Sequence, residues 1–471
     1  MKVLLTHGYF LEEDEKEQLI MKPYVPLGIL YISAYLEQHG VENEVFDSTF
    51  SNRKSFCDYI TAYRPGVIGI YTNLMTKPNV LNMIGYIRER LPGTRIVLGG
   101  PEVRASAERF LRAGADYIVI GEGELTMLEL VRAIEQDREA AVVMIPGLAI
   151  LLDGQFIRTA EREKIADLDQ LPFPNRKKVN LQLYLDTWNS HHGRSAVSVN
   201  TMRGCPYSCR WCSRAVYGAS YRRRSPENVV RELEEVYNTY RPGSIWFVDD
   251  VFTINHKWLR GFNDVLQAKQ LKISYECITR ADRLNEEAIM LLKASGCFRV
   301  WIGAESGSQQ VIDLMDRRVK VEQVRDMIRL ASKHGLETGT FIMLGYPGET
   351  EADIKETIYH LKQSNPDHFT ITIAYPIRGT ELFQQVESQQ LNSPDWATST
   401  DRDINFKRTY NRRYYDHAVK HVVCEVNYHK LLQQKLKNWK RIPYLKLQSV
   451  LARGGMWLEK NRSAGAQETP R

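Results

Sequence analysis

Short runs of aliphatic and β-branched residues alternate with longer segments of mixed polarity over the first 140 positions of the chain. The short runs have the continuous apolar character of parallel strands that are buried on both faces. The predicted strands are Lys2–Thr6, Glu44–Asp47, Gly66–Tyr71, Arg95–Gly99 and Tyr117–Ile120. One helix is expected to open at Pro26–Gly28 and to end after Gln38, and another to cover Asn79–Leu91. This alternation predicts a doubly wound, Rossmann-like parallel sheet over residues 1–140.

The alternation is lost over residues 141–190 and then resumes. The two prolines of Leu171–Asn175 exclude a continuous helix or a central strand, so residues 141–190 are interpreted as a linker. The strands predicted after it are Ala196–Thr201, Ser244–Val248, Ser274–Ile278, Phe298–Ile302, Thr338–Leu344 and His368–Tyr375. Six strand–helix units over residues 191–390 favour a partial, TIM-like (β/α)6 barrel over an open sheet. Residues 391–471 are polar and predict a helical C-terminal region, with a disordered tail over Asn461–Pro470.

Composition places the chain among ordinary globular proteins. Its 471 residues are 43% hydrophobic and 25% charged. No apolar run reaches the roughly 18–20 residues of a membrane span, and the N-terminus turns acidic too soon for a secretory signal. These features predict a cytoplasmic protein without a membrane span. The net charge of +6 is concentrated in segments such as Lys407–Arg413 and Lys435–Arg441, where a solvated helical face is a simpler interpretation than a nucleic-acid surface.

Three of the seven cysteines, Cys205, Cys209 and Cys212, lie within eight residues, just after a predicted strand. Three thiolates on one loop can hold three irons of a 4Fe–4S cluster and leave the fourth iron open to a ligand. A structural zinc site is the alternative, but zinc normally takes four protein ligands, and no nearby Cys or His pair completes the set. An electron-transfer ferredoxin would likewise need a fourth cysteine. The spacing therefore favours a cluster with one open iron.

This C-x₃-C-x₂-C run, with Trp211 before its last cysteine, resembles the radical S-adenosylmethionine (SAM) superfamily. Members carry C-x₃-C-x-aromatic-C on the loop after the first strand of a partial TIM-like barrel. The resemblance implies that the amino and carboxylate groups of SAM bind the open iron, and it places Trp211 near the adenine. It also implies that reduction of the cluster, by a donor such as flavodoxin or ferredoxin, cleaves SAM to a 5′-deoxyadenosyl radical.

Polar residues at the ends of the next barrel strands fit the same resemblance, because barrel sites lie at the carboxyl ends of the strands. Asp249 and Asp250 stand where the family has a Gly-Gly-Glu motif that meets the SAM ammonium group. Arg280 follows the third strand and is expected to pair with the SAM carboxylate. Glu305 and Ser306 follow the fourth strand and are expected to contact the SAM ribose or amine. No single motif here is specific, but their order and spacing together are.

Glycine-rich strand ends in the first 140 residues resemble, in their order, those of cobalamin-binding radical SAM proteins. The segments are Pro26–Gly28, Arg64–Ile70, Leu98–Glu102 and Ile120–Glu124. Glycines there would let a wide, flat ring lie against the backbone. The cobalamin contacts implied by the resemblance are Tyr71, Thr72, Asn73, Leu74, Gly99, Gly100, Pro101, Glu102, Gly121 and Glu122. A Rossmann-like domain with a different ligand, or with none, is the alternative; a dinucleotide is disfavoured because no G-x-G-x-x-G follows the first strand.

Histidine ligation of the cobalt is not expected. Cobalamin domains that supply a histidine lower ligand carry D-x-H-x-x-G, and neither His7 nor His39 has this surrounding sequence. The lower face of the cobalamin is therefore expected to meet the residues after the third strand, from Tyr71 to Leu74.

The function implied by the resemblance is cobalamin-dependent methyl transfer to an unactivated carbon or phosphorus centre. The substrate class is a small molecule, a lipid or a natural-product intermediate. One alternative is a non-methylating radical SAM cyclase, epimerase or rearrangement enzyme, and another is an iron–sulfur RNA-binding protein that uses the basic C-terminal region. The sequence identifies neither the substrate nor a catalytic residue.

Overall fold

The computed structural model describes residues 1–433 and 441–465, and the chain divides into two compact units. The first unit contains Met1–Pro206, Ser213–Val248 and Pro394–Asp401. The second contains Tyr207–Cys212, Asp249–Ser393 and the residues from Arg402 onward. The division between the units therefore passes through the cysteine run and again through the second series of strands.

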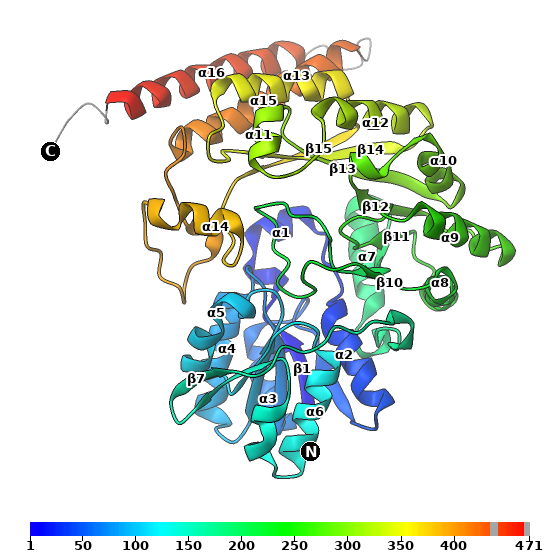
Figure 1. Cartoon of the computed structure of the whole chain (residues 1–471), viewed down its shortest axis with the longest axis vertical. Helices are drawn as coiled ribbons and strands as arrows, with labels where there is room; N and C mark the ends of the chain where they lie inside the picture. Colours follow the sequence, from blue (N-terminus) through cyan, green and yellow to red (C-terminus); the bar gives the residue numbers. More distant parts are fainter. Residues whose placement is uncertain (434–440, 466–471) are drawn as a thin grey trace. The chain divides into compact units, whose positions relative to one another are not determined.

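A seven-stranded sheet forms the centre of the first unit (Figure 1). Its strand order is β2-β1-β3-β4-β5-β6-β7. The strands are β1 (Val3–His7), β2 (Asn43–Phe46), β3 (Val67–Tyr71), β4 (Arg95–Gly99), β5 (Tyr117–Val119), β6 (Leu148–Leu152) and β7 (Gln155–Arg158). The first five are parallel, and β1 is buried along its whole length, which explains why these strands are apolar runs.

Helices cover both faces of this sheet, and a hydrophobic core lies on each face. Successive side chains of a strand point to opposite faces, so Leu4 packs in one core while Val3 and Leu5 pack in the other. The core around Leu4 takes side chains from α3 (Arg53–Tyr63), α4 (Lys77–Arg90) and α5 (Val103–Arg112). The opposite core takes them from α2 (Leu27–Gln38) and α6 (Glu124–Glu135). The predicted doubly wound arrangement is confirmed.

The structure differs from the predicted linker over residues 141–190, because β6 and β7 form an antiparallel hairpin there. Asp153 and Gly154 connect the two strands with φ values of +49° and +77°, as a two-residue type I′ turn requires. β6 also pairs antiparallel with β5, so the hairpin extends the sheet and makes it mixed. α7 (Leu181–His192) follows before the second sheet begins. An Asp-Gly pair between apolar runs was the available sequence signal for the hairpin.

Six strands form a second, parallel sheet, in the order β15-β14-β13-β12-β11-β8. They are β8 (Ala196–Val199), β11 (Ser244–Phe247), β12 (Tyr275–Thr279), β13 (Cys297–Glu305), β14 (Glu337–Leu344) and β15 (His368–Ile373). Each overlaps a predicted strand, and the sequential order without closure agrees with a partial barrel. A short antiparallel pair, β9 (Met202–Arg203) and β10 (Arg222–Arg223), flanks the cysteine run in the sequence.

The remaining helices connect these strands or follow the last one. They are α1 (Glu15–Ile20), α8 (Pro226–Tyr240), α9 (His256–Ala268), α10 (Glu286–Ala294), α11 (Gln309–Leu314), α12 (Val321–Lys333), α13 (Glu351–Ser364), α14 (Glu381–Val386), α15 (Arg412–Gln433) and α16 (Arg441–Gly465). Among the described residues, no helix has both the length and the apolar character of a membrane span.

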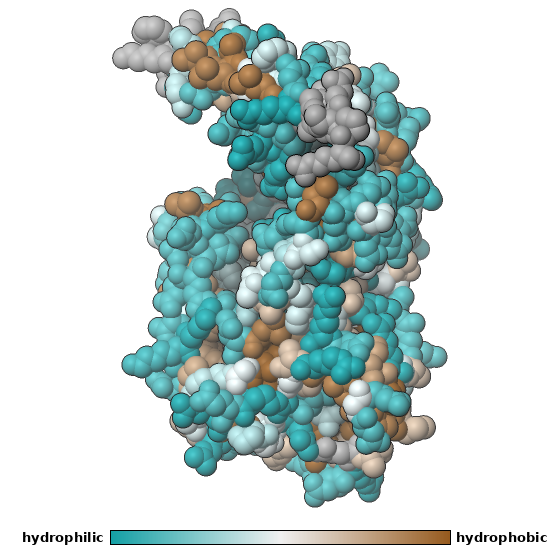
Figure 2. All heavy atoms as spheres, turned by 90° about the vertical axis from the view of Figure 1, so that its left-hand side faces the viewer, coloured by the Kyte–Doolittle hydropathy of each residue, from teal (hydrophilic) through white to brown (hydrophobic). Residues whose placement is uncertain are grey.

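The C-terminal region is helical, as predicted, and α15 and α16 pack against each other. The predicted disordered tail is wrong over Asn461–Gly465, which continue α16; its last residues lie outside the described part of the chain, as do residues 435–440 of the second basic segment. α16 exposes large apolar side chains, including Leu447, Leu451 and Trp457. Figure 2 shows apolar side chains gathered at the top of the view, where the C-terminal helices lie.

Candidate functional site

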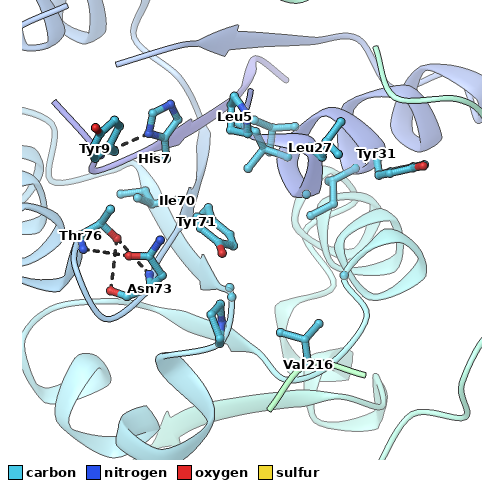
Figure 3. Close-up of a pocket in the computed structure, with 18 of the residues that line it drawn as sticks. Leu5, His7, Tyr9, Leu27, Tyr31, Ile70, Tyr71, Asn73, Thr76 and Val216 are labelled. Atoms are coloured by element: carbon cyan, nitrogen blue, oxygen red, sulfur yellow. Dashed lines mark hydrogen bonds between the residues drawn. The ribbon is translucent and has the colours of Figure 1, made fainter. Parts of the chain in front are cut away.

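A cavity of about 600 Å³ lies in the first unit, at the carboxyl ends of its parallel strands. Figure 3 shows that side chains from separate segments surround it, among them Leu27 of α2, Tyr71 at the end of β3, and Val216. Ligands bind at this edge in doubly wound sheets, because there the strands end and helices begin. Seven of the ten predicted cobalamin contacts line the cavity: Tyr71, Asn73, Gly99, Gly100, Pro101, Gly121 and Glu122.

Glycines leave part of the cavity wall as bare backbone. Gly28, Gly99 and Gly121 all line the cavity, and a Cβ atom added at any of them would meet no atom closer than 3.7 Å. Gly121 also has φ +93°, a conformation that favours glycine. A flat ligand can therefore approach the backbone at three different strand or helix ends, which fits the group implied by the sequence resemblance.

Three predicted contacts do not line the cavity: Thr72, Leu74 and Glu102. Thr72 is fully buried and its backbone N–H donates to the Gly99 carbonyl at 2.7 Å, which joins the ends of β3 and β4. The Glu102 carboxylate is buried 4.0 Å from the Lys77 ammonium group. Thr72 and Glu102 therefore connect neighbouring segments of the protein beside the cavity.

Buried charges form one end of the cavity. The Arg203 guanidinium lies 3.0 Å from Glu122 and also binds Glu124, while Arg222 contacts Glu122 at 2.7 Å. Burial alone would favour the neutral acid, but the hydrogen bond from Arg222 and the charge of Arg203 lower the pKa of Glu122. Glu122 is thus ionised and paired within the protein. The sequence prediction missed both arginines, although they flank the cysteine run closely.

The histidine of the cavity wall is held by polar neighbours. His7 Nε2 lies 3.0 Å from the Asp47 carboxylate, and its Nδ1 lies 3.2 Å from the backbone nitrogen of Tyr9. Burial raises the pKa of the nearby Tyr71 phenol to about 12, with a hydrogen bond from Asn73 opposing the shift. Both ring nitrogens of His7 are engaged, and Tyr71 presents a neutral phenol.

None of the three clustered cysteines is in a disulfide, and Cys209 is the buried one. Within the loop, the Cys212 N–H donates to the Cys209 carbonyl at 3.2 Å, and the Arg210 N–H donates to the Met315 carbonyl at the same distance. Across residues 1–433 and 441–465, no three His, Cys, Asp or Glu side chains are already gathered as a metal site. The case for a cluster therefore rests on the donor set itself, which is three cysteine side chains on one loop.

Two buried arginines meet at the sulfur of Cys209. Arg280 Nη1 and Arg317 Nη1 each lie 3.7 Å from Cys209 Sγ. Arg280 also donates from Nε to Asp282 and from Nη2 to the Arg317 carbonyl, both at 2.8 Å. Its guanidinium carbon lies 3.8 Å from the centre of the Tyr207 ring. The structure thus directs Arg280 toward a cysteine, whereas the sequence prediction directed it toward a SAM carboxylate.

Glu305 has an unusual backbone at the end of β13. Its φ is +67°, and the register of β13 against β14 shifts between Gly303 and Glu305. Bulges and left-handed residues at strand ends are common at functional sites, where they re-aim a side chain. The Glu305 carboxylate lies 3.6 Å from Arg317. Burial raises its pKa, while the charges of Arg317 and Arg280 oppose the shift.

The other predicted SAM contacts are Trp211, Asp249, Asp250 and Ser306. Trp211 packs beside a hydrophobic cluster that contains Tyr346, and Asp250 is exposed next to the buried Asp249. Partial desolvation and the neighbouring Asp249 carboxylate raise the pKa of Asp250. Ser306 is buried and accepts a hydrogen bond from the Ser308 N–H at 3.2 Å, so its side chain supports the local turn.

Comparisons with known proteins match both parts of the chain. The family model described as the radical SAM superfamily matches residues 199–361, and the B12 binding domain matches residues 21–131. An uncharacterised methyltransferase of Pyrococcus horikoshii is 30% identical over 389 residues, which cover 80% of this chain and 82% of that protein. The anaerobic magnesium-protoporphyrin IX monomethyl ester cyclase of Rubrivivax gelatinosus is 27% identical over 395 residues, covering 82% and 70%.

A solved structure shares the fold. The radical SAM methyltransferase TsrM from Kitasatospora setae, with cobalamin and a [4Fe–4S] cluster bound, matches with a TM-score of 0.69. The match covers 82% of this chain and 74% of that structure, at 20% sequence identity.

Proposed function

This chain belongs to the radical SAM superfamily and carries a B12-binding domain, and we propose that it is a cobalamin-dependent methyltransferase. The observation that carries the proposal is the combination of two sites in one chain. One is the cysteine run, and the other is the glycine-walled cavity of about 600 Å³ inside the B12-binding domain. The methyl group would go to an unactivated carbon or phosphorus centre of a small molecule, lipid or natural-product intermediate.

The cysteine run would hold a 4Fe–4S cluster through Cys205, Cys209 and Cys212, none of which is in a disulfide. When bound, the cluster and SAM supply a 5′-deoxyadenosyl radical, and cobalamin supplies the methyl group that is transferred. Trp211, Asp250 and Glu305 remain our proposed contacts to SAM, whereas Arg280 directs its Nη1 to the sulfur of Cys209. Ser306 is left out, because its hydroxyl is used within its own turn.

The cavity would hold cobalamin through bare backbone at Gly28, Gly99 and Gly121, with Tyr71 and Asn73 at the end of β3. Both nitrogens of His7 are engaged by protein groups, so we propose that the lower face of the cobalamin meets Tyr71 and Asn73 without a histidine ligand. Arg203, which bonds both Glu122 and Glu124, fixes the cavity end next to Tyr217.

A second candidate function is cyclisation without methyl transfer. It is favoured by one observation, the 27% identity to the anaerobic cyclase of Rubrivivax gelatinosus. Both functions need a one-electron donor of low potential, such as flavodoxin or ferredoxin, and differ in the fate of SAM. Methyl transfer consumes one SAM as a methyl source and another as a radical source, whereas cyclisation uses only the radical.

Labelled SAM separates the two functions. The protein, reconstituted anaerobically with iron, sulfide and cobalamin, would be incubated with methyl-deuterated SAM and candidate substrates. Methyl transfer predicts equal amounts of S-adenosylhomocysteine and 5′-deoxyadenosine, with the deuterated methyl group in the product. 5′-Deoxyadenosine alone would favour the cyclase. Salt-dependent retention of RNA, with neither SAM product formed, would instead support the RNA-binding alternative.

The cobalamin cavity has its own test. Gly99→Leu places a large side chain in the cavity wall, so we expect at least a tenfold loss of cobalamin affinity with no change in iron content. Gly85→Leu is the matched control, because a Cβ at Gly85 on α4 meets no atom within 4 Å and Gly85 does not line the cavity. Equal cobalamin binding by both variants would remove this cavity from the proposal.

A further inference from the structure

Two positively charged side chains lie at the sulfur of Cys209. Arg280 and Arg317 are both buried, at 2% and 8% exposure, and each directs an Nη1 atom to the Cys209 sulfur at 3.7 Å. Arg280 follows β12 and Arg317 lies between α11 and α12, and they are 71 and 108 residues from Cys209 in the sequence. Two guanidinium groups thus converge on one thiol of the proposed cluster site.

Neighbouring groups fix both arginines in this orientation. Asp282 and the Arg317 carbonyl accept from Arg280 at 2.8 Å, while the Tyr207 ring covers one face of its guanidinium. Arg317 donates from Nη2 to the Gly303 carbonyl at 3.0 Å, and Glu305 lies 3.6 Å away. Each arginine keeps its carboxylate partner and still directs a donor to the sulfur. These contacts fix the orientation of both guanidinium groups, because neither can rotate away from Cys209 without losing hydrogen bonds.

We propose that Arg280 and Arg317 raise the reduction potential of the cluster through N–H···S bonds and positive charge at Cys209. This inference rests on the proposed function, since it requires the cluster on Cys205, Cys209 and Cys212. In the step concerned, the oxidised [4Fe–4S]²⁺ cluster takes one electron from a low-potential donor and becomes [4Fe–4S]¹⁺, with no bond broken and no proton moved. The added negative charge resides on iron and sulfur, where cations and N–H donors stabilise it.

The consequence is a cluster that a biological flavodoxin or ferredoxin can reduce more readily. Hydrogen bonds to the sulfurs and the net charge around a cluster are the main means by which proteins set its potential. Arginine suits this role because it is always charged and offers several donors in one plane. The two residues act through Cys209, so they are positioning residues and not catalytic ones.

Redox titration of the reconstituted full-length protein, followed by the electron paramagnetic resonance signal of the reduced cluster, measures the effect directly. Arg280→Met and Arg317→Met keep much of the side-chain volume but remove the charge and donors. We expect each to make reduction at least tenfold less favourable, which corresponds to a fall of about 59 mV for a one-electron couple. Arg280→Lys and Arg317→Lys keep the charge without the planar fork and should show smaller falls.

Arg318→Met is the matched control. Arg318 follows Arg317 directly, but its side chain is 73% exposed and pairs with Asp316. Its loss removes one positive charge from the surface but no N–H···S bond, so the potential should fall by much less than in Arg317→Met. A fall equal to that of Arg317→Met would show a general charge effect and overturn the proposal. Unchanged potentials in the Met variants, or in the Lys variants if the Met variants assemble no cluster, would also overturn it.

Equilibrium SAM binding separates this role from direct ligand contact. A large loss of SAM affinity in Arg280→Met at an unchanged potential would assign Arg280 to the SAM carboxylate and refute redox tuning. A different result would refute the proposed function, namely that the wild-type protein binds no four-iron cluster after reconstitution. If the wild-type cluster forms and its potential is the same in the arginine variants, only the proposed redox role of the two arginines is contradicted.

Discussion

Glu349, in the turn after β14, should make the stability of the protein fall as the pH rises. Its carboxyl is fully buried, and Oε2 accepts a hydrogen bond from the Gly345 N–H at 2.5 Å, while Oε1 has no hydrogen-bond partner among the described residues. Burial raises the pKa of Glu349 to about 8; the Gly345 hydrogen bond opposes this, and the nearby Asp353 charge adds to it. The folded protein therefore keeps this proton at neutral pH.

The magnitude follows from the difference between the folded and unfolded pKa values. Below pH 4.5, the ordinary pKa of the group, both states are protonated and the stability does not depend on it. Between pH 4.5 and about 8, only the unfolded chain releases the proton, so stability falls as the pH rises. The slope is about 1.4 kcal/mol per pH unit, or about 2.7 kcal/mol between pH 6 and 8. Above about pH 8 both states are ionised and the loss is complete.

Glu349→Gln tests this reasoning, because an amide keeps the acceptor for the Gly345 N–H but does not titrate. Thermal unfolding of the wild type and the variant would be compared at pH 6, 7 and 8. Between pH 6 and 8, we expect the melting temperature of the wild type to fall by about 5–10 °C relative to that of the variant. This range follows because about 1 kcal/mol of unfolding free energy shifts the melting temperature of a domain of this size by about 2–4 °C. Glu351→Gln, at an exposed ion pair two residues away, is the control. Parallel pH profiles for the wild type and Glu349→Gln would refute the buried, protonated carboxyl.

Three further outcomes are expected. Replacing Cys205, Cys209 and Cys212 together with Ala should abolish both the visible absorption of the cluster and SAM cleavage. The control variant Cys57→Ala should keep both. Four irons bound to the triple variant would contradict the assignment of these cysteines. Arg203→Met leaves the buried Glu122 and Glu124 without their shared cation and should destabilise the fold by about 3–5 kcal/mol. Arg104→Met, at an exposed arginine, should change the stability by about 1 kcal/mol or less. Equal effects of the two substitutions in chemical unfolding would contradict this role of Arg203. Electron paramagnetic resonance of bound cob(II)alamin should show no nitrogen superhyperfine splitting, and such splitting would restore a histidine or other nitrogen ligand.

The sequence by itself determined the elements that local patterns encode. The apolar runs predicted β1, β3 and β4, because strands buried on both faces must be apolar throughout. α2 begins and ends where Pro26 and Gly40 indicated, since proline suits a helix start and glycine a residue beyond its end. The cysteine run was visible for the same reason: its three donors are neighbours in the chain.

Only the tertiary structure decided which charged side chains meet. Arg317 reaches Cys209 across 108 residues, and Arg203 reaches Glu122 across 81. Such contacts depend on which distant segments of the chain lie side by side, and no local sequence pattern encodes that arrangement. The same limit explains Ser306 and Thr72, whose positions were predicted from strand ends but whose side chains are buried within the protein. A strand end gives a residue its place in the fold, whereas the packing of neighbouring elements decides which way its side chain faces.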